Sequence, residues 1–179
     1  MKKHLISSSK FLSLVLRHDP AAIGLTLDAQ GWADIPELLT KMATAGHRLS
    51  PEELEEIVAT NEKKRFAIEA GRIRAQQGHS IDIDLGLSPV QPPEELFHGS
   101  AEQNRDSILK NGLHPAARQH VHLSADLATA RQVGTRHGRP LIFTVASGAM
   151  HRAGHPFYLS GNGVWLCDAV PAEYIRGEA

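Results

Sequence analysis

Three prolines between residues 85 and 95, in the stretch LGLSPVQPPEE, constrain the fold of this chain more than any other feature. Proline lacks a backbone N–H and clashes with the preceding helical turn, so neither a helix nor a central strand is expected to run through this stretch. The stretch also lacks helical periodicity, which is typical of a linker. We therefore expect two domains, 1–84 and 96–179, joined by residues 85–95, in a chain of 179 residues that is long enough to bury a core.

The first half carries two strong helix-start signals. Asp34 precedes an apolar-periodic run and is followed three residues later by Glu37, which is the spacing of a capping box. Ser50 and Glu53 repeat this spacing, and Pro51 suits the first helical position. We therefore predict helices that begin after residues 34 and 50.

A β-hairpin is predicted after these helices. In RFAIEAGRIRA, Phe66 and Ile68 alternate with small or polar residues, and a turn at Ala70-Gly71 precedes Ile73. Helices followed by a hairpin are typical of a winged-helix-like lobe, although a fold does not by itself establish nucleic-acid binding.

The stretch FLSLVLRHDP, residues 11–20, places Arg17 and His18 together where a helix is expected to end before Asp19-Pro20. A simple interpretation is that a cation at this position complements the partial negative charge of the helix C-terminus. The alternative is that both side chains bind an anion.

A second basic group lies in NEKKRF, before the predicted hairpin. Lys63 and Arg65 alternate, so on an extended segment they point the same way. They form either a solvated charge run or a phosphate clamp, in which arginine matches two phosphate oxygens and lysine adds a point charge. His79 and Ser80 follow a glycine in QQGHS and are a weak additional signal.

The second half has shorter elements, typical of an α+β domain. FHGS and HVHLS each place a histidine, His98 and His122, at a strand end. Gly99 opens a turn in which a ligand approaches the backbone closely, and its N–H and C=O can pair with an amide. Two strand histidines are also potential metal ligands, but no third ligand with usable spacing accompanies them. Ser124 is a candidate cap for the helix that follows it.

Composition excludes several classes of protein. The formal net charge is −1, so any anion site must be local. The single Cys167 excludes an internal disulfide and a multi-cysteine zinc site and is consistent with a reducing compartment, so we expect a cytoplasmic protein. The apolar run near the N-terminus is too short for a signal peptide, and we expect no membrane span. Loop motifs of nucleotide-binding folds and hydrolases are absent from the sequence.

Taken in order, LSLVLRHDP, NEKKRF, IRAQQGHS, LFHGS, HVHLS and VGTRHGRP resemble the NAD-dependent RNA (tRNA) 2′-phosphotransferases, over about residues 5–175. The resemblance implies a winged-helix-like RNA-binding lobe followed by an ADP-ribosyltransferase-like lobe that binds NAD, with the active site in the cleft between them. NAD is the consumed co-substrate, RNA carrying a 2′-phosphate is the partner, no metal is needed, and we expect a monomer.

The resemblance also implies roles for individual residues. The family's catalytic quartet corresponds to Arg17, His18, Arg65 and Arg136, although the neighbouring Arg139 is an alternative for the fourth member. Lys63, His79 and Ser80 are expected to bind the RNA substrate. The residues expected to contact NAD are His98, Gly99, Ser100, His122 and Ser124.

In the reaction that the resemblance implies, the 2′-phosphate displaces nicotinamide from NAD and the RNA becomes 2′-phospho-ADP-ribosylated. The adjacent ribose hydroxyl then attacks phosphorus and releases 2′-OH RNA and ADP-ribose 1″,2″-cyclic phosphate. Two alternatives stay open. One is an ADP-ribosyltransferase acting on terminal nucleic-acid phosphates or another phosphorylated acceptor. The other is a winged-helix regulator with a sensory NAD-binding lobe, against which the acidic helix SPEELEEIVAT argues.

Overall fold

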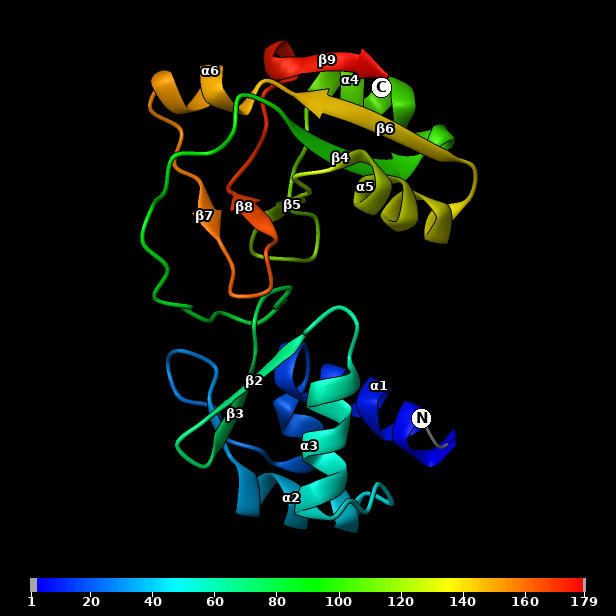
Figure 1. Cartoon of the computed structure of the whole chain (residues 1–179), viewed down its shortest axis with the longest axis vertical. Coiled ribbons are helices and arrows are strands. Elements are labelled where there is room, and N and C mark those ends of the chain that lie inside the picture. The colour runs from blue at the N-terminus through cyan, green and yellow to red at the C-terminus, as the bar shows by residue number, and fades with distance from the viewer. Residues whose placement is uncertain (1–2, 179) are drawn as a thin grey trace. The chain divides into compact units, whose positions relative to one another are not determined.

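The computed structural model describes residues 3–178 and divides the chain into two compact units, Met1–Gly86 and Leu87–Ala179 (Figure 1). Each unit combines helices with small antiparallel sheets, in agreement with the predicted α+β class. Among the described residues, no helix combines the length and the apolar character that crossing a membrane requires.

In its described part, residues 3–86, the first unit contains three α-helices and one three-stranded sheet of order β1-β3-β2. Both cap predictions are confirmed, because the Asp34 carboxylate accepts the Glu37 N–H at 3.0 Å and Ser50 and Glu53 form a complete capping box. The hairpin is confirmed as well, with Phe66 opposite Ala75 and positive φ angles at Ala70 and Gly71. The elements are α1 (Lys3–Arg17), η1 (Pro20–Ile23), β1 (Ala33–Asp34), α2 (Ile35–Thr44), α3 (Pro51–Thr60), β2 (Phe66–Glu69) and β3 (Arg72–Ala75).

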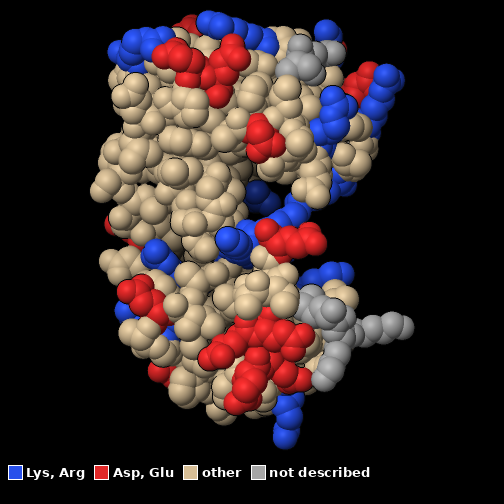
Figure 2. Space-filling view, in the orientation of Figure 1, with Lys and Arg blue, Asp and Glu red and all other residues tan. Residues whose placement is uncertain are grey.

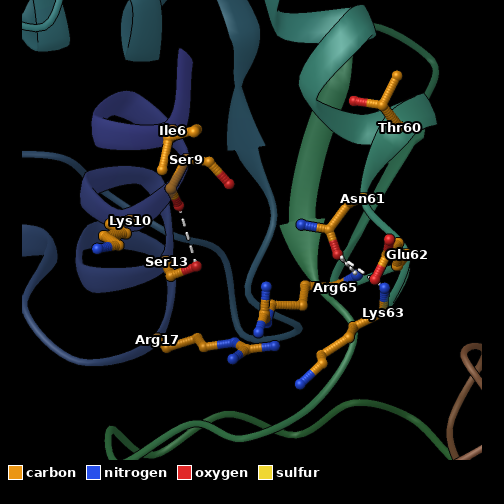
Figure 3. A pocket seen from close by; sticks show the side chains of 10 residues that line it. All are labelled: Ile6, Ser9, Lys10, Ser13, Arg17, Thr60, Asn61, Glu62, Lys63 and Arg65. Carbon is orange, nitrogen blue, oxygen red and sulfur yellow. Dashed lines mark hydrogen bonds between the residues drawn. The ribbon is translucent and has the colours of Figure 1, made fainter. Parts of the chain in front are cut away.

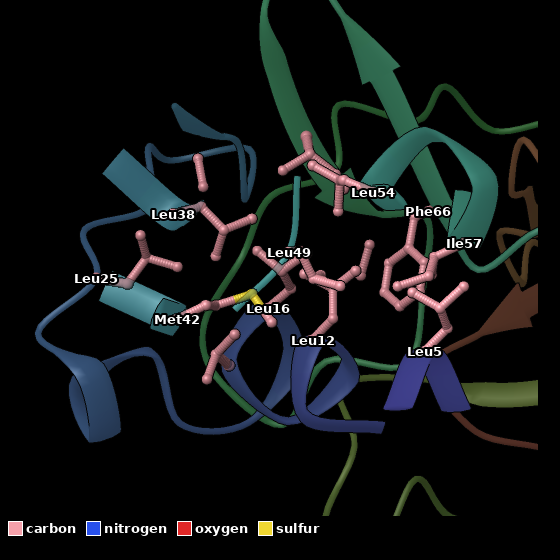
Figure 4. Close-up of a cluster of buried hydrophobic side chains, with 14 residues drawn as sticks. Leu5, Leu12, Leu16, Leu25, Leu38, Met42, Leu49, Leu54, Ile57 and Phe66 are labelled. Carbon is pink, nitrogen blue, oxygen red and sulfur yellow. The ribbon is translucent and has the colours of Figure 1, made fainter. Parts of the chain in front are cut away.

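One face of α1 supplies much of the core of this unit (Figure 4). Leu5, Leu12 and Leu16 are fully buried there, against side chains of α2, α3 and the sheet. Because α1 turns by about 100° per residue, its polar positions between these leucines face the other way. The packing of α1 therefore leaves a polar face available for a site.

The second unit contains two three-stranded antiparallel sheets, of order β4-β6-β9 and β5-β8-β7. A bridge between Phe97 and Ser124 connects the two sheets. The elements are β4 (Leu96–Ala101), η2 (Glu102–Asn104), α4 (Arg105–Asn111), β5 (Val121–Leu123), α5 (Leu127–Gly134), η3 (Thr135–His137), β6 (Pro140–Val145), α6 (Ser147–Arg152), β7 (Tyr158–Leu159), β8 (Trp165–Cys167), η4 (Ala172–Tyr174) and β9 (Ile175–Glu178).

The proline-rich stretch has neither helix nor strand before residue 96, and residues 90–94 are bound to the second unit. The Val90 N–H donates to the carbonyl of Phe157 at 2.8 Å, and the Ser147 hydroxyl donates to the carbonyl of Pro93 at 2.7 Å. Arg152 donates to both carboxylate oxygens of Glu94, at 2.7 and 3.1 Å. These hydrogen bonds thus fix residues 90–94 along the second unit.

Two local predictions in the second unit are wrong. Ser124 does not cap the following helix, because its backbone exchanges hydrogen bonds with Phe97 at 2.8 and 2.9 Å. The cap is Asp126, whose carboxylate accepts the Thr129 N–H at 2.8 Å. Gly99 does not form a turn either, since it lies inside β4 opposite Ile142.

Candidate functional site

A pocket of about 690 Å³ opens in the first unit between α1, the end of α3 and residues 61–65 (Figure 3). Arg17, Lys63 and Arg65, three of the residues predicted from sequence, line it together. Sequence reasoning missed the remaining lining residues, which are Ile6, Ser9, Lys10, Ser13, Thr60, Asn61 and Glu62.

The α1 wall of the pocket follows from helical spacing. Positions 6, 10, 13 and 17 of α1 are spaced by three or four residues, so their side chains form one stripe of the helix, and Ser9 lies between this stripe and the buried leucines. Ser13 donates its hydroxyl to the Ser9 carbonyl at 3.1 Å, inside the helix. Arg17 stands in the last turn, half-buried, and its side chain extends toward the 61–65 loop in Figure 3. The same periodicity was present in the sequence and could have identified this polar stripe.

The opposite wall is a tight loop that Asn61 organises. The Asn61 side-chain oxygen accepts the N–H groups of Lys63 at 3.2 Å and Arg65 at 3.4 Å. Lys64 adopts a positive φ of 41°, and the carbonyl of Arg65 accepts the Gln76 N–H at 2.8 Å. The side chains of Lys63 and Arg65 line the same pocket, but through this turn and not through the extended segment that their alternation predicted (Figure 3).

His18 directly follows Arg17 and is exposed. Its ring nitrogen Nδ1 is 2.9 Å from the Ser80 hydroxyl, and the Ser80 N–H donates to the Arg17 carbonyl at 3.0 Å. Gly78, at a φ of +86°, lies against the Arg17 guanidinium, since an added Cβ would stand 3.6 Å from Cζ. Residues 78–80 thus hold Arg17 and His18 in place, while His79 itself is buried at 2 % exposure.

The pocket is locally positive, in contrast to the chain as a whole. Four basic side chains and one carboxylate, Glu62, line it, although the chain has a formal net charge of −1. Figure 2 shows acidic side chains gathered over α3, whose sequence carries four glutamates. A cluster of guanidinium and ammonium groups in a concave site suits a compact anion such as phosphate.

Arg72 and Arg74, the other basic residues near the hairpin, lie elsewhere. Their guanidinium carbons stand 5.3 and 4.6 Å from the ring centre of Trp32. Arg72 also pairs with Asp28 at 3.1 Å, and Arg74 donates to the carbonyls of Gln30 and Leu85. These contacts give both arginines a structural role, because a cation over an aromatic face and charge-assisted hydrogen bonds stabilise the fold.

In the second unit, His98 is held in one tautomer. Its Nδ1 is 3.1 Å from the carbonyl oxygen of His122, which only accepts, so Nδ1 carries the proton. Burial lowers the pKa of His98 below its usual 6.5, and the hydrogen bond to His122 opposes this shift less strongly. His98 is therefore neutral near pH 7.

Gly99 stands where helix α5 packs directly on strand β4. A Cβ added to Gly99 would lie 1.8 Å from the carbonyl oxygen of Ala130, so only glycine permits this approach. Successive residues of a strand turn their backbone groups to opposite edges. The N–H and C=O of Phe97 bond to Ser124. The N–H and C=O of Gly99, two residues further along β4, therefore face the same edge of the strand. Ser100 is buried and its hydroxyl accepts from the Asn104 amide at 3.1 Å.

The two candidates for the fourth quartet residue differ in their surroundings. Arg136 is exposed on η3, whereas Arg139 pairs with Glu102 at 3.5 Å. Arg136 and the residues expected to contact NAD belong to the second unit, and Arg17, His18 and Arg65 belong to the first. That they act on one phosphate stays a prediction.

Neither the single cysteine nor the described potential metal ligands form a second reactive site. Burial, together with the charge of Asp168, raises the pKa of the Cys167 thiol to about 12, so this cysteine is not a nucleophile at neutral pH. Within residues 3–178, no three histidine, cysteine or acidic side chains gather as a metal site would require.

The fold and the pocket define an α+β protein of two units with a cationic site for a compact anion in the first. Comparison with known proteins specifies the family. Residues 3–169 match the model of the RNA 2′-phosphotransferase, Tpt1 / KptA family, and the chain belongs to this family. A relative from Hahella chejuensis is 59 % identical over 177 residues, which cover 98 % of this chain and 95 % of the relative. Relatives from Flavobacterium johnsoniae, 54 % identical with 95 % and 94 % covered, and Streptomyces griseus, 50 % identical with 97 % of each covered, are similar too. All three are described as probable RNA 2′-phosphotransferases.

Proposed function

We propose that the chain removes an internal 2′-phosphate from RNA and uses NAD as the consumed acceptor. The observation that carries the proposal is the pocket in which Arg17, Lys63 and Arg65 converge, with His18 beside it, in a member of this family. One extra phosphate needs a pocket of directed donors more than a broadly basic face, which agrees with the near-neutral net charge.

In the first step, a phosphate oxygen attacks the ribose carbon that bears nicotinamide. The C–N bond breaks, nicotinamide leaves with the bonding electrons, and the RNA becomes 2′-phospho-ADP-ribosylated. The nucleophile is an existing phosphate oxygen, so no base is needed to generate it. Arg17, Lys63 and Arg65 position the phosphate, whose negative charge decreases in this step.

In the second step, the neighbouring ribose hydroxyl attacks phosphorus and the bond to the RNA 2′-oxygen breaks. A proton moves overall from that hydroxyl to the leaving oxygen, and negative charge builds on the equatorial oxygens. Arg65 and His18 stabilise this charge, and His18, oriented by Ser80, donates a proton to the 2′-oxygen. The products are 2′-OH RNA and ADP-ribose 1″,2″-cyclic phosphate.

The second unit offers groups that fit NAD. The N–H and C=O of Gly99 face one sheet edge and suit the donor and acceptor of a carboxamide. His98 is neutral with Nδ1 bound to His122, so its other ring nitrogen accepts. Ser100, His122 and Ser124 extend this set, and Arg136 completes the group that acts on the phosphate. No metal is required.

This proposal interprets the first unit as a winged-helix-like RNA-binding lobe and the second as an ADP-ribosyltransferase-like lobe. It also places the chain in tRNA processing, as a cytoplasmic monomer. A second candidate function is the transfer of ADP-ribose to terminal phosphates. The same pocket supports it, because a terminal phosphate, like a 2′-phosphate, carries more negative charge than a backbone phosphodiester.

Binding competition tests the substrate choice. Two matched RNA oligonucleotides, with and without one internal 2′-phosphate, compete for the protein in the absence of NAD. Each charge-assisted contact contributes about 1.5–3 kcal/mol, so two or three contacts predict at least a ~100-fold preference. A preference below ~10-fold at moderate salt would show that backbone phosphates carry the binding. A third oligonucleotide with only a terminal phosphate separates the two functions.

A further inference from the structure

Asn61 lines the pocket beside the two cations of the 61–65 loop. It follows α3 directly and is half-buried. Its side-chain oxygen accepts the N–H groups of Lys63 and Arg65, at 3.2 and 3.4 Å, and its carbonyl accepts the Lys64 N–H at 2.8 Å. The side-chain oxygen of Asn61 is therefore committed to the loop that presents the two cations.

These bonds determine how the Asn61 amide is turned. Both partners are N–H donors, so the atom that faces them must be the oxygen and not the nitrogen. The nitrogen then points the opposite way, and Figure 3 shows it directed across the pocket toward α1. An amide nitrogen carries two N–H donors, and here they face the pocket on the α1 side of Asn61, in the same lining as Arg17 and Arg65.

We propose that the Asn61 amide nitrogen donates a hydrogen bond to the anion held by Arg17, Lys63 and Arg65, and so selects for phosphate. The inference rests on the proposed function only for the identity of that anion as an RNA 2′-phosphate. Phosphate oxygens have more lone pairs than three cations saturate, and a fixed neutral donor adds direction that a mobile ammonium group lacks.

Nuclear magnetic resonance observes this donor directly. In the ¹⁵N-labelled full chain, the side-chain NH₂ pair of Asn61 is identified as the pair missing from the Asn61→Asp variant. Titration with inorganic phosphate, and separately with the 2′-phosphorylated oligonucleotide, should shift this pair strongly. An Arg65→Ala chain under the same titration should show little shift. An unmoved Asn61 pair, while the Arg17 and Arg65 guanidinium signals move, would overturn the proposal.

Affinity measurements on two variants distinguish the donor role of Asn61 from its role in holding the loop. Asn61→Asp keeps the oxygen that the loop needs but replaces the donor by a carboxylate oxygen facing the anion. Its affinity for the 2′-phosphorylated oligonucleotide should fall at least ~30-fold, because a charge-assisted contact is lost and repulsion is added. Ala59→Asp places the same charge on the exposed end of α3, outside the lining, and should change affinity less than ~3-fold.

The outcomes distinguish the two proposals. Equal affinity of Asn61→Asp and the wild-type chain would overturn the role of Asn61 while the preference for 2′-phosphorylated RNA stands. If the wild-type chain shows no such preference but inorganic phosphate still shifts the Asn61 pair, the proposed function fails and the donor stands. Should Asn61→Asp fail to fold, the wild-type titration decides, with the NH₂ pair assigned through its contacts to Lys63 and Arg65.

Discussion

Replacing Gly99 by alanine tests how tightly α5 packs on β4. The added Cβ would lie 1.8 Å from the carbonyl oxygen of Ala130, 2.8 Å from its carbon and 2.9 Å from the Gly134 nitrogen. All three are backbone atoms, so no side chain can rotate away. Ordinary contact begins near 3.4 Å, so α5 would have to retreat by more than 1 Å.

The energetic result follows from packing. Overpacking a core costs about 1–3 kcal/mol, occasionally more, and a gap of this width also forfeits about half of the dispersion contacts beneath the helix. We therefore expect Gly99→Ala to lower the free energy of unfolding of the second unit by about 3 kcal/mol or more. Binding of NAD should weaken with it, because β4 presents the Gly99 backbone.

The assay uses the two tryptophans, since Trp32 lies in the first unit and Trp165 in the second. In a Trp32→Phe background, urea denaturation followed by fluorescence reports the second unit. Gly163→Ala is the control, because Gly163 has a φ of +80° but nothing within 4 Å of an added Cβ. Backbone strain alone should cost about 1–2 kcal/mol there. An effect of Gly99→Ala no larger than that of Gly163→Ala would refute the close approach.

Three further predictions concern protonation, capping and the reaction. The unfolded chain protonates His98 near pH 6.5, whereas burial lowers the pKa of His98 in the folded chain. Stability of the second unit should therefore fall as the pH drops through 6.5, because the unfolded chain then binds a proton that the folded chain does not, and His98→Gln should flatten this fall in urea titrations. Asp126→Ala should lower the unfolding free energy by about 1 kcal/mol through the lost cap. The bonds from Thr129 lower the pKa of Asp126, so its contribution is complete above about pH 4 and disappears as pH falls through the folded pKa, whereas Asp126→Asn should cap without this dependence. Arg65→Ala and His18→Ala should slow the second chemical step by about 10²–10³ and the first step less. Time-resolved quenching with RNA labelled at its 2′-phosphate would then show 2′-phospho-ADP-ribosylated RNA, and equal slowing of both steps would assign these residues to binding alone.

Local signals predicted the first unit well. The caps at Asp34 and Ser50 depend on side chains three residues apart, and the Ala70-Gly71 turn depends on its own two φ angles. Interactions between residues this close in the chain can be recognised from short stretches of sequence. The convergence of Lys63 and Arg65 on one pocket was expected from an extended segment, whereas it arises from the turn at Lys64.

Predictions that depended on distant partners were less successful. The sequence predicted Ser124 as the cap, but its pairing with Phe97 withdraws Ser124 from that role and Asp126 caps the helix instead. Gly99 was assigned to a turn because the sequence does not show that α5 needs its missing side chain. The short strands β1 and β9 exist only through pairing with strands that are distant in the sequence, so no local pattern indicates them.

Apart from Ile6, the pocket residues that the sequence did not reveal have polar side chains whose role depends on the fold. Ser9 and Ser13 are ordinary helix residues until the leucine face of α1 is buried. Asn61 is an ordinary helix-end residue until its oxygen is seen to bind the next loop. The spacing of Asn61 ahead of Lys63 and Arg65 is the one signal that could have found it.

The most direct test of the central claim is product analysis of a single mixture of the protein, NAD and RNA bearing one internal 2′-phosphate. The account predicts release of nicotinamide in equal amount to 2′-OH RNA and ADP-ribose 1″,2″-cyclic phosphate, and no nicotinamide release with the matched RNA that lacks the 2′-phosphate. Loss of the 2′-phosphate as inorganic phosphate without NAD, or nicotinamide release that is independent of the 2′-phosphate, would contradict it.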